Sequence, residues 1–162
     1  MASKASIMGH PIHPMLLPFP LALWVFSFIC DVIYLLTKDA IWPLVAKVTL
    51  AGGIVGGVLA AVPGIIDWLA IQSREIKKIA NWHARLNVIA LLIFAASFYL
   101  RIKYGRPLVG GGLTIPTLLS AIGVLLISVS GWLGGSLAYE HGVGVKPQHD
   151  SPEREAAKVR YP

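Results

Sequence analysis

The sequence is poor in charged residues and has a single cysteine. Of its 162 residues, 14% are charged and 56% are hydrophobic, and the mean hydropathy is +0.69. A composition this apolar excludes an ordinary soluble domain. The single cysteine, Cys30, excludes both a disulfide framework and a thiolate metal cluster. The chain is therefore expected to lie in a lipid bilayer.

Motifs of common enzyme classes are also lacking. The sequence contains no P-loop, no GxGxxG after a strand, no HExxH and no GxSxG, so hydrolase and nucleotide-dependent activities are not expected. The start MASKASIMGH lacks the apolar core and cleavage site of a removable signal peptide. The net charge of +6 comes from Lys and Arg that flank apolar segments without forming a basic stripe. Membrane lipids with anionic headgroups are therefore a simpler partner than nucleic acid.

Four apolar stretches are long enough to cross about 30 Å of hydrocarbon as helices. They run from Met15 to Leu36, Pro43 to Ala70, Leu86 to Tyr104 and Leu113 to Tyr139. We expect an all-α integral membrane protein, an up-and-down bundle of four transmembrane helices. Residues 1–14 are interpreted as a histidine–proline entry segment, residues 15–141 as the transmembrane domain and residues 142–162 as a solvated tail. Such a tail could dock on another subunit.

Up-and-down threading brings the amino terminus, the second loop and the carboxyl tail to one membrane face. We call this face side A and the opposite face side B. Side A carries nine Lys and Arg residues and side B carries five. Because loops rich in Lys and Arg stay in the cytoplasm, we expect both termini to be cytoplasmic.

Four of the five histidines are predicted to meet at side A. They come from three regions of the chain and are His10, His13, His83 and His141. Neutral imidazole is a common ligand of haem iron and of transition metals. The sequence therefore predicts a site for haem b or for non-haem iron, copper or zinc, and electron transfer with a redox partner. The alternative is a structural or accessory subunit of a larger membrane complex, without a cofactor, whose histidines hydrogen-bond to loop carbonyls.

Small and hydroxylated residues recur at helical spacing along one face of each segment, which we interpret as the face inside the bundle. Three glycine pairs have the spacing that lets helix backbones approach closely: Gly52 with Gly56, Gly53 with Gly57, and Gly131 with Gly135. The same glycines could instead leave a slot for a porphyrin. The spacing alone does not choose between these interpretations, and it also permits a homo-oligomer.

Several polar residues near the histidines are candidates to support the site. Asp67 is predicted either to accept a hydrogen bond from a metal-bound imidazole or to pair with Arg85 or Arg74. Asn87, one turn inside the histidine of the third segment, suits a similar supporting role. Glu140 is a further supporting candidate at the end of the fourth segment, and we expect its carboxylate to point to the headgroups.

Two further features carry structural expectations. In the motif HPIHP, residues 10–14, each proline disfavours helical backbone in the histidine before it, so both histidines should be extended. Asp31 lies in the side B half of the first segment, where a lone charge in hydrocarbon is unfavourable. We expect it to form an ion pair at the membrane edge with Lys47 or Lys38.

The blocks GHPIHPMLLPFPLAL, AAVPGIIDWLAI, WHARLN and SGWLGGSLAYEHGVGV resemble an uncharacterised bacterial family of membrane proteins, the domain of unknown function 2231. The resemblance spans roughly residues 9 to 145 and implies a four-span bundle in the bacterial inner membrane. It supplies no established activity. Some relatives resemble fusions to cytochrome c-like modules, although this chain has no CxxCH motif. The motif positions that it marks are His10, His13, Asp67, His83, Asn87 and His141.

Overall fold

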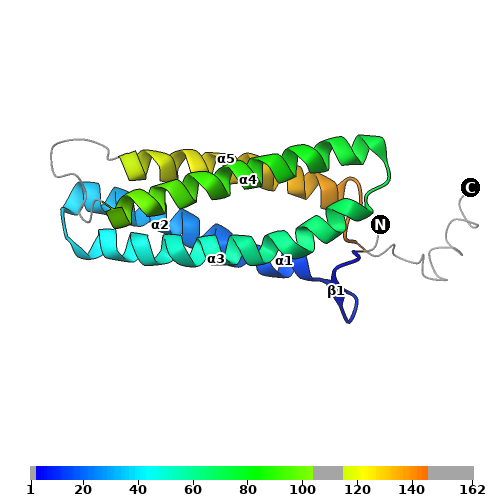
Figure 1. Ribbon diagram of the computed structural model, residues 1–162, viewed down its shortest axis with the longest axis horizontal. Coiled ribbons are helices and arrows are strands. Elements are labelled where there is room, and N and C mark those ends of the chain that lie inside the picture. Colours follow the sequence, from blue (N-terminus) through cyan, green and yellow to red (C-terminus); the bar gives the residue numbers. More distant parts are fainter. Residues whose placement is uncertain (1–2, 104–114, 146–162) are drawn as a thin grey trace, which may run out of the picture.

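The computed structural model describes residues 3–103 and 115–145, and in these ranges four long helices form an elongated bundle (Figure 1). The bundle confirms the predicted all-α, four-helix architecture. The role predicted for the tail falls largely on residues 146–162, which lie outside the described residues. The elements, in chain order, are strands β1 (Ser6–Ile7) and β2 (His10–Pro11), which pair antiparallel, and helices α1 (Ile12–Leu16), α2 (Pro18–Thr37), α3 (Ile41–Ala70), α4 (Arg74–Lys103) and α5 (Ile115–Tyr139).

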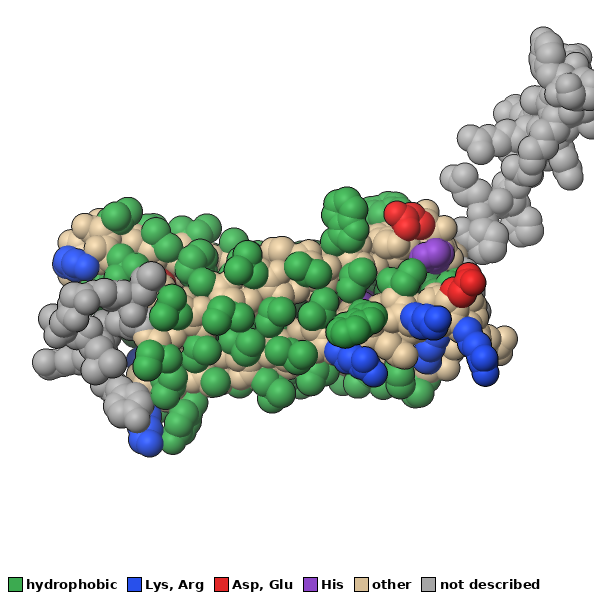
Figure 2. Space-filling view, turned by 90° about the horizontal axis from the view of Figure 1, so that it is seen from above, with side chains coloured by type: hydrophobic (Ala, Val, Ile, Leu, Met, Phe, Trp, Pro, Cys, Tyr) green, Lys and Arg blue, Asp and Glu red, His purple; other side chains and the backbone are tan. Residues whose placement is uncertain are grey.

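The surface of the bundle is that of a multi-pass membrane protein. Four helical spans, with α1 and α2 counted as one, are long and apolar enough to cross a membrane. Only 17% to 28% of the residues in each apolar window are buried inside the bundle, so lipid must cover most of the others. On the face shown in Figure 2, hydrophobic side chains cover the middle, and Lys and Arg lie near the two ends.

The start of α4 differs most from the sequence prediction. The helix begins at Arg74, about three turns before the predicted start at Leu86. Its first turns carry basic residues such as Lys77 and Lys78, so a criterion based on an apolar run did not include them. The predicted third segment, which begins at Leu86, left His83 just before the helix, and this boundary is wrong. His83 lies inside α4, on a rigid element.

The backbone of the HPIHP motif is extended at only one of its two histidines. His10 lies in β2, as expected, whereas His13 lies inside α1. The prediction of an extended His13 is therefore wrong. The imidazole of His13 reaches the carbonyl of Ala60 on α3, and this tertiary contact outweighs the local effect of Pro14.

The first helical hairpin, formed by α1 and α2 with α3, and the second hairpin, α4–α5, repeat the same hydrogen bonds. In both hairpins a histidine contacts a carbonyl 47 residues later, and a serine contacts a carbonyl 19 residues later. Each residue of the second set lies 70 positions after its equivalent in the first, which is also the separation of Asp31 and Arg101. The recurring contacts are His13–Ala60 and His83–Ser130, and Ser27–Ala46 and Ser97–Pro116.

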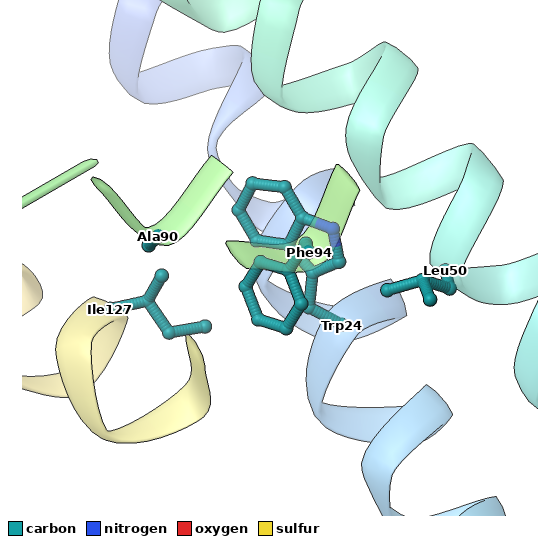
Figure 3. Packing of buried hydrophobic residues seen from close by; sticks show 5 residues of the cluster. All are labelled: Trp24, Leu50, Ala90, Phe94 and Ile127. Carbon is teal, nitrogen blue, oxygen red and sulfur yellow. The ribbon is translucent and has the colours of Figure 1, made fainter. Parts of the chain in front are cut away.

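Equivalent residues of the two hairpins also meet one another along the centre of the bundle. In the middle, the indole of Trp24 stacks on the ring of Phe94 with centroids 4.5 Å apart and planes at 14° (Figure 3). Residues on a twofold axis contact their own equivalents. The two hairpins are therefore related by an approximate twofold axis along the bundle. The pairs that meet across it are His13 with His83, Trp24 with Phe94, and Asp31 with Arg101.

Glycines let these central rings pack directly on the neighbouring helix backbone. A Cβ atom at Gly53 would lie 2.4 Å from the indole of Trp24, and one at the equivalent Gly123 would lie 2.6 Å from the ring of Phe94. The glycines of α3 therefore accommodate side chains of the protein itself, which supports the interpretation of close packing. The predicted pair on α5 differs, because a Cβ at Gly131 would meet nothing within 4 Å in the described part of the chain.

Candidate functional site

At the side A end, two histidines on different helices form what we call the imidazole pair, His13 and His83. Their ring centroids lie 6.4 Å apart, and the ring planes are almost perpendicular, at 88°. The Nδ1 atom of His13 lies 2.7 Å from the carbonyl oxygen of Ala60, and that of His83 lies 2.8 Å from the carbonyl oxygen of Ser130. The approximate twofold axis therefore gives both rings the same anchor.

These anchors define which ring nitrogen is available for a ligand. A carbonyl oxygen only accepts hydrogen bonds, so each Nδ1 carries the proton and each Nε2 keeps a lone pair. The contact of Asn87 agrees, because its amide Nδ2 lies 3.1 Å from Nε2 of His83 and can only donate. An imidazole whose Nδ1–H is held by a carbonyl is oriented as metal-ligating histidines usually are.

Contacts with glycines and with a serine hydroxyl also hold the rings in place. A Cβ atom at Gly64 would lie 2.9 Å from the ring of His13, and one at the equivalent Gly134 would lie 3.0 Å from the ring of His83. Each imidazole thus rests against a glycine backbone. The hydroxyl of Ser130 also lies 3.0 Å from Nδ1 of His83 and donates to the carbonyl of that histidine at 3.2 Å.

The other two predicted histidines do not join the imidazole pair. His10 is exposed on β2, and His141 is half-buried in the turn after α5, where its backbone N–H donates to the carbonyl of Ser136. Within residues 3–103 and 115–145, there is no group of three or more His, Cys, Asp or Glu arranged to hold a metal ion. Of the four histidines, the structure therefore brings two into ring contact.

Asp67 holds the amino-terminal segment. Its carboxylate accepts hydrogen bonds from the hydroxyl of Ser3 at 2.8 Å and from the backbone N–H groups of Lys4 at 2.8 Å and Ala5 at 3.1 Å. Among the described residues no imidazole, Arg85 or Arg74 contacts this carboxylate, so the predicted partners of Asp67 are wrong. Residues 3–5 have no sequence pattern that predicts ordered structure, and the contact could therefore not be anticipated. Asp67 thereby ties the chain before the β1–β2 hairpin to the side A end of α3.

The remaining supporting candidates, Arg85 and Glu140, contact residues close to them in the sequence. The guanidinium of Arg85 lies 5.4 Å from the ring centroid of Trp82. The carboxylate of Glu140 is exposed, as expected, and accepts a hydrogen bond of 2.5 Å from the hydroxyl of Ser136. Asn87 is thus the supporting candidate that lies in direct contact with the imidazole pair.

We expect Asp67→Ala to release the amino-terminal segment without unfolding the bundle. The substitution removes the acceptor of three hydrogen bonds and leaves their donors unpaired, which should destabilise the attachment of residues 3–5 by about 1–3 kcal/mol. The loss of order should be confined to this segment. Hydrogen exchange at the amides of Lys4 and Ala5 should become faster. Glu140→Ala, which removes an exposed carboxylate on the same face, is the control and should leave this exchange unchanged. Equal exchange in Asp67→Ala and the parent protein would contradict the assignment.

At the opposite end of the bundle, Asp31 forms a buried ion pair. Arg101 donates from Nη1 to Oδ1 at 2.7 Å and from Nη2 to Oδ2 at 2.5 Å, and the two side chains are 10% and 4% exposed. The predicted ion pair is confirmed, but the prediction of Lys47 or Lys38 as its partner is wrong. The parallel course of α2 and α4 brings Arg101 to the level of Asp31, whereas the ammonium of Lys38 lies over the ring of Tyr34.

The comparison with known families agrees with these observations. Residues 9–147 match the family described as "Predicted membrane protein (DUF2231)", and this range includes all four spans and the imidazole pair. No curated protein and no solved structure gives a significant match. The match covers most of the 162 residues, and the chain belongs to this family of membrane proteins.

Proposed function

We propose that the protein binds a redox-active metal ion through the imidazole pair and transfers electrons at side A of the membrane. The imidazole pair is the observation that carries this proposal, because two rings from different helices lie edge to face, with centroids 6.4 Å apart and with both Nδ1 atoms anchored. With metal–nitrogen bonds of about 2.0–2.1 Å, two imidazoles on one ion have centroids roughly 5 to 6.5 Å apart. The observed spacing of 6.4 Å lies at the upper end of this range, which corresponds to an ion with the two imidazole nitrogens on opposite sides.

Copper is the ion that this donor set favours. Imidazole nitrogen suits copper, iron and zinc, and copper stands highest in the affinity order of the divalent metals. Zinc has no redox chemistry and takes three or four protein ligands. Haem b also takes two axial histidines, but a porphyrin needs an open slot, and the glycines beside the pair, Gly64 and Gly134, are in contact with the imidazoles themselves. The residues around the imidazole pair fit a single ion better than they fit a porphyrin.

The position of the imidazole pair also suggests where electrons would be exchanged. Both rings are half-buried and lie near the side A end, within reach of a redox partner or of a larger membrane complex. The distribution of Lys and Arg supports a cytoplasmic side A in a bacterial inner membrane. In this arrangement the chain's own residues fix the two imidazoles, and the bound ion would supply the change of oxidation state.

One observation favours a structural role as the second candidate. His83 makes hydrogen bonds from both ring nitrogens, to Ser130 and with Asn87, and its ring packs on Gly134. A histidine that is satisfied in this way can hold α4 and α5 together without any ligand. An accessory subunit without a cofactor would need no more than this.

We expect the detergent-purified protein to contain about one copper ion per chain after reconstitution with copper. In His13→Ala and in His83→Ala the affinity for copper should fall by more than about 100-fold. Substitution of residues that only support a metal ligand costs up to about 100-fold, and loss of a ligand itself should cost more. The measurements are elemental analysis and absorption spectra before and after dithionite. His10→Ala and His141→Ala are matched controls on the same membrane face and should retain the metal.

Two other results would change the proposal. A Soret band that shifts on reduction would identify haem as the occupant instead of a bare ion. The absence of both metal and Soret band after reconstitution, or an equal loss in the control variants, would favour the accessory role.

A further inference from the structure

The approximate twofold axis makes differences between equivalent residues informative at the imidazole pair. The carbonyl anchors and the glycines under the two rings are equivalent in the two hairpins. One helical turn further into the bundle the equivalence ends, because Asn87 follows His83 where Leu17 follows His13. The two halves therefore present the same ring in two different chemical surroundings.

Asn87 engages the nitrogen of His83 that carries the lone pair. Its Nδ2 lies 3.1 Å from Nε2 of His83 and 3.0 Å from the carbonyl oxygen of the same residue. Leu17 has no polar side-chain atom, and in the described part of the chain Nε2 of His13 has no hydrogen-bond partner. His13 thus presents an open lone pair, whereas the lone pair of His83 is occupied.

We propose that Asn87 acts as a latch on the metal site, and this inference rests on the proposed function. By latch we mean that the amide of Asn87 occupies the Nε2 lone pair of His83 until a metal ion displaces it. A single lone pair cannot accept a hydrogen bond and bind a metal ion at the same time. The ion must therefore bind first at His13 and then displace the amide of Asn87 from His83. The amide keeps its contact with the backbone carbonyl of His83, so opening the latch costs one hydrogen bond and needs no rearrangement of α4.

The latch determines which ions bridge the two imidazoles. An ion whose bond to the second imidazole is weaker than the hydrogen bond from Asn87 stays on His13 alone, whereas Cu(I), which binds two nitrogens on opposite sides, gains more and bridges the pair. Asn87 acts through His83 and does not touch the ion, so it is a positioning residue. It sets how readily His83 accepts the ion after His13 has bound it.

The test exchanges the residues that differ between the halves. Asn87→Leu copies Leu17 and should bind Cu(I) about three- to tenfold more tightly, the equivalent of one neutral hydrogen bond. Leu17→Asn is the matched control, because it places an amide one turn inside His13 and should weaken binding by a similar factor. Affinity is measured anaerobically by competition with a chromogenic Cu(I) chelator, on full-length protein in detergent.

The outcomes separate the latch from the proposed function. If neither the parent protein nor Asn87→Leu binds Cu(I), the proposed function fails. If both bind with equal affinity, the latch fails and the proposed function stands. The ¹⁵N resonance of Nε2 in His83, recorded without metal, provides a second measurement. It should move in Asn87→Leu, and an unchanged resonance would overturn the latch whatever the metal result.

Discussion

The variant Asp31→Arg should not form a stable bundle, and exchange of the two charges in Asp31→Arg with Arg101→Asp should restore most of the stability. Removing one partner of a buried ion pair costs about 3–5 kcal/mol, because the other charge is left without a counterion. Asp31→Arg adds a second guanidinium at the same place, so its effect should be at the upper end. Thermal unfolding in detergent, followed by circular dichroism, measures both variants.

The exchange should fall short of full recovery for a reason visible in the structure. Arg101 also donates to the hydroxyls of Ser97 and Ser120, at 3.3 and 3.2 Å. The position equivalent to Ser120 in the first hairpin is Leu50, which has no acceptor. An arginine at position 31 would therefore lose one hydrogen bond, worth about 0.5–1.5 kcal/mol.

Glu75→Arg serves as the control for the effect of charge alone, because Glu75 is exposed in the first turn of α4. Its reversal should cost less than about 1 kcal/mol, mainly through the helix dipole. If Asp31→Arg unfolds no more easily than this control, the ion pair does not carry the stability assigned to it. If the exchange variant is as unstable as Asp31→Arg, the two positions are not equivalent.

The ion pair also explains why the two hairpins of one chain pair with each other. In a twofold arrangement a residue on the axis faces its own equivalent. Two first hairpins from different chains would place Asp31 against Asp31, and two second hairpins would place Arg101 against Arg101. Like charges in a buried site are unfavourable. The difference between the two repeats therefore favours the pairing seen within the chain.

The number of spans and the inward faces could be predicted from the sequence. A span needs a long apolar stretch to cross the bilayer, and polar residues within it face the interior of the bundle because their exposure to lipid is unfavourable. The start of α4 could not be predicted in this way, because its first turns contain charged residues and therefore do not belong to an apolar stretch. The lateral position of His10 could not be predicted either. Threading assigns a residue to a membrane face, but the β1–β2 hairpin decides where on that face it lies.

The internal repeat did leave a signal. The segment from α1 to α2 contains H-x3-L-x2-P-x3-W-x2-S-x3-D from His13 to Asp31, and α4 contains H-x3-N-x2-A-x3-F-x2-S-x3-R from His83 to Arg101. Only the histidine and the serine are identical, so similarity of residue type does not reveal the repeat. Comparing the spacing of the two inward faces would have revealed it, and would have paired Asp31 with Arg101.

In the central aromatic layer, the two halves differ at two neighbouring positions, and the size differences compensate each other. Trp24 and Gly57 in the first half are equivalent to Phe94 and Ile127 in the second. A Cβ at Gly57 would lie 2.6 Å from Cη2 of Trp24, whereas the smaller ring of Phe94 leaves room for Ile127 in the same core cluster. The larger ring, Trp24, therefore packs beside a glycine, and the smaller ring, Phe94, packs beside an isoleucine.

Gly57→Ile should therefore destabilise the bundle by about 1–3 kcal/mol or more, because it overfills the space next to Trp24. Adding Trp24→Phe, which copies the second half, should recover much of the loss. The recovery is helped by removal of the Trp24 Nε1–H group, which is buried without a hydrogen-bond partner among the described residues. The control is Gly131→Ile on α5, where an added Cβ meets nothing within 4 Å among residues 3–103 and 115–145 and stability should not change. Thermal unfolding of these variants distinguishes the outcomes, and a double variant no more stable than Gly57→Ile would show that the repeats do not share this packing.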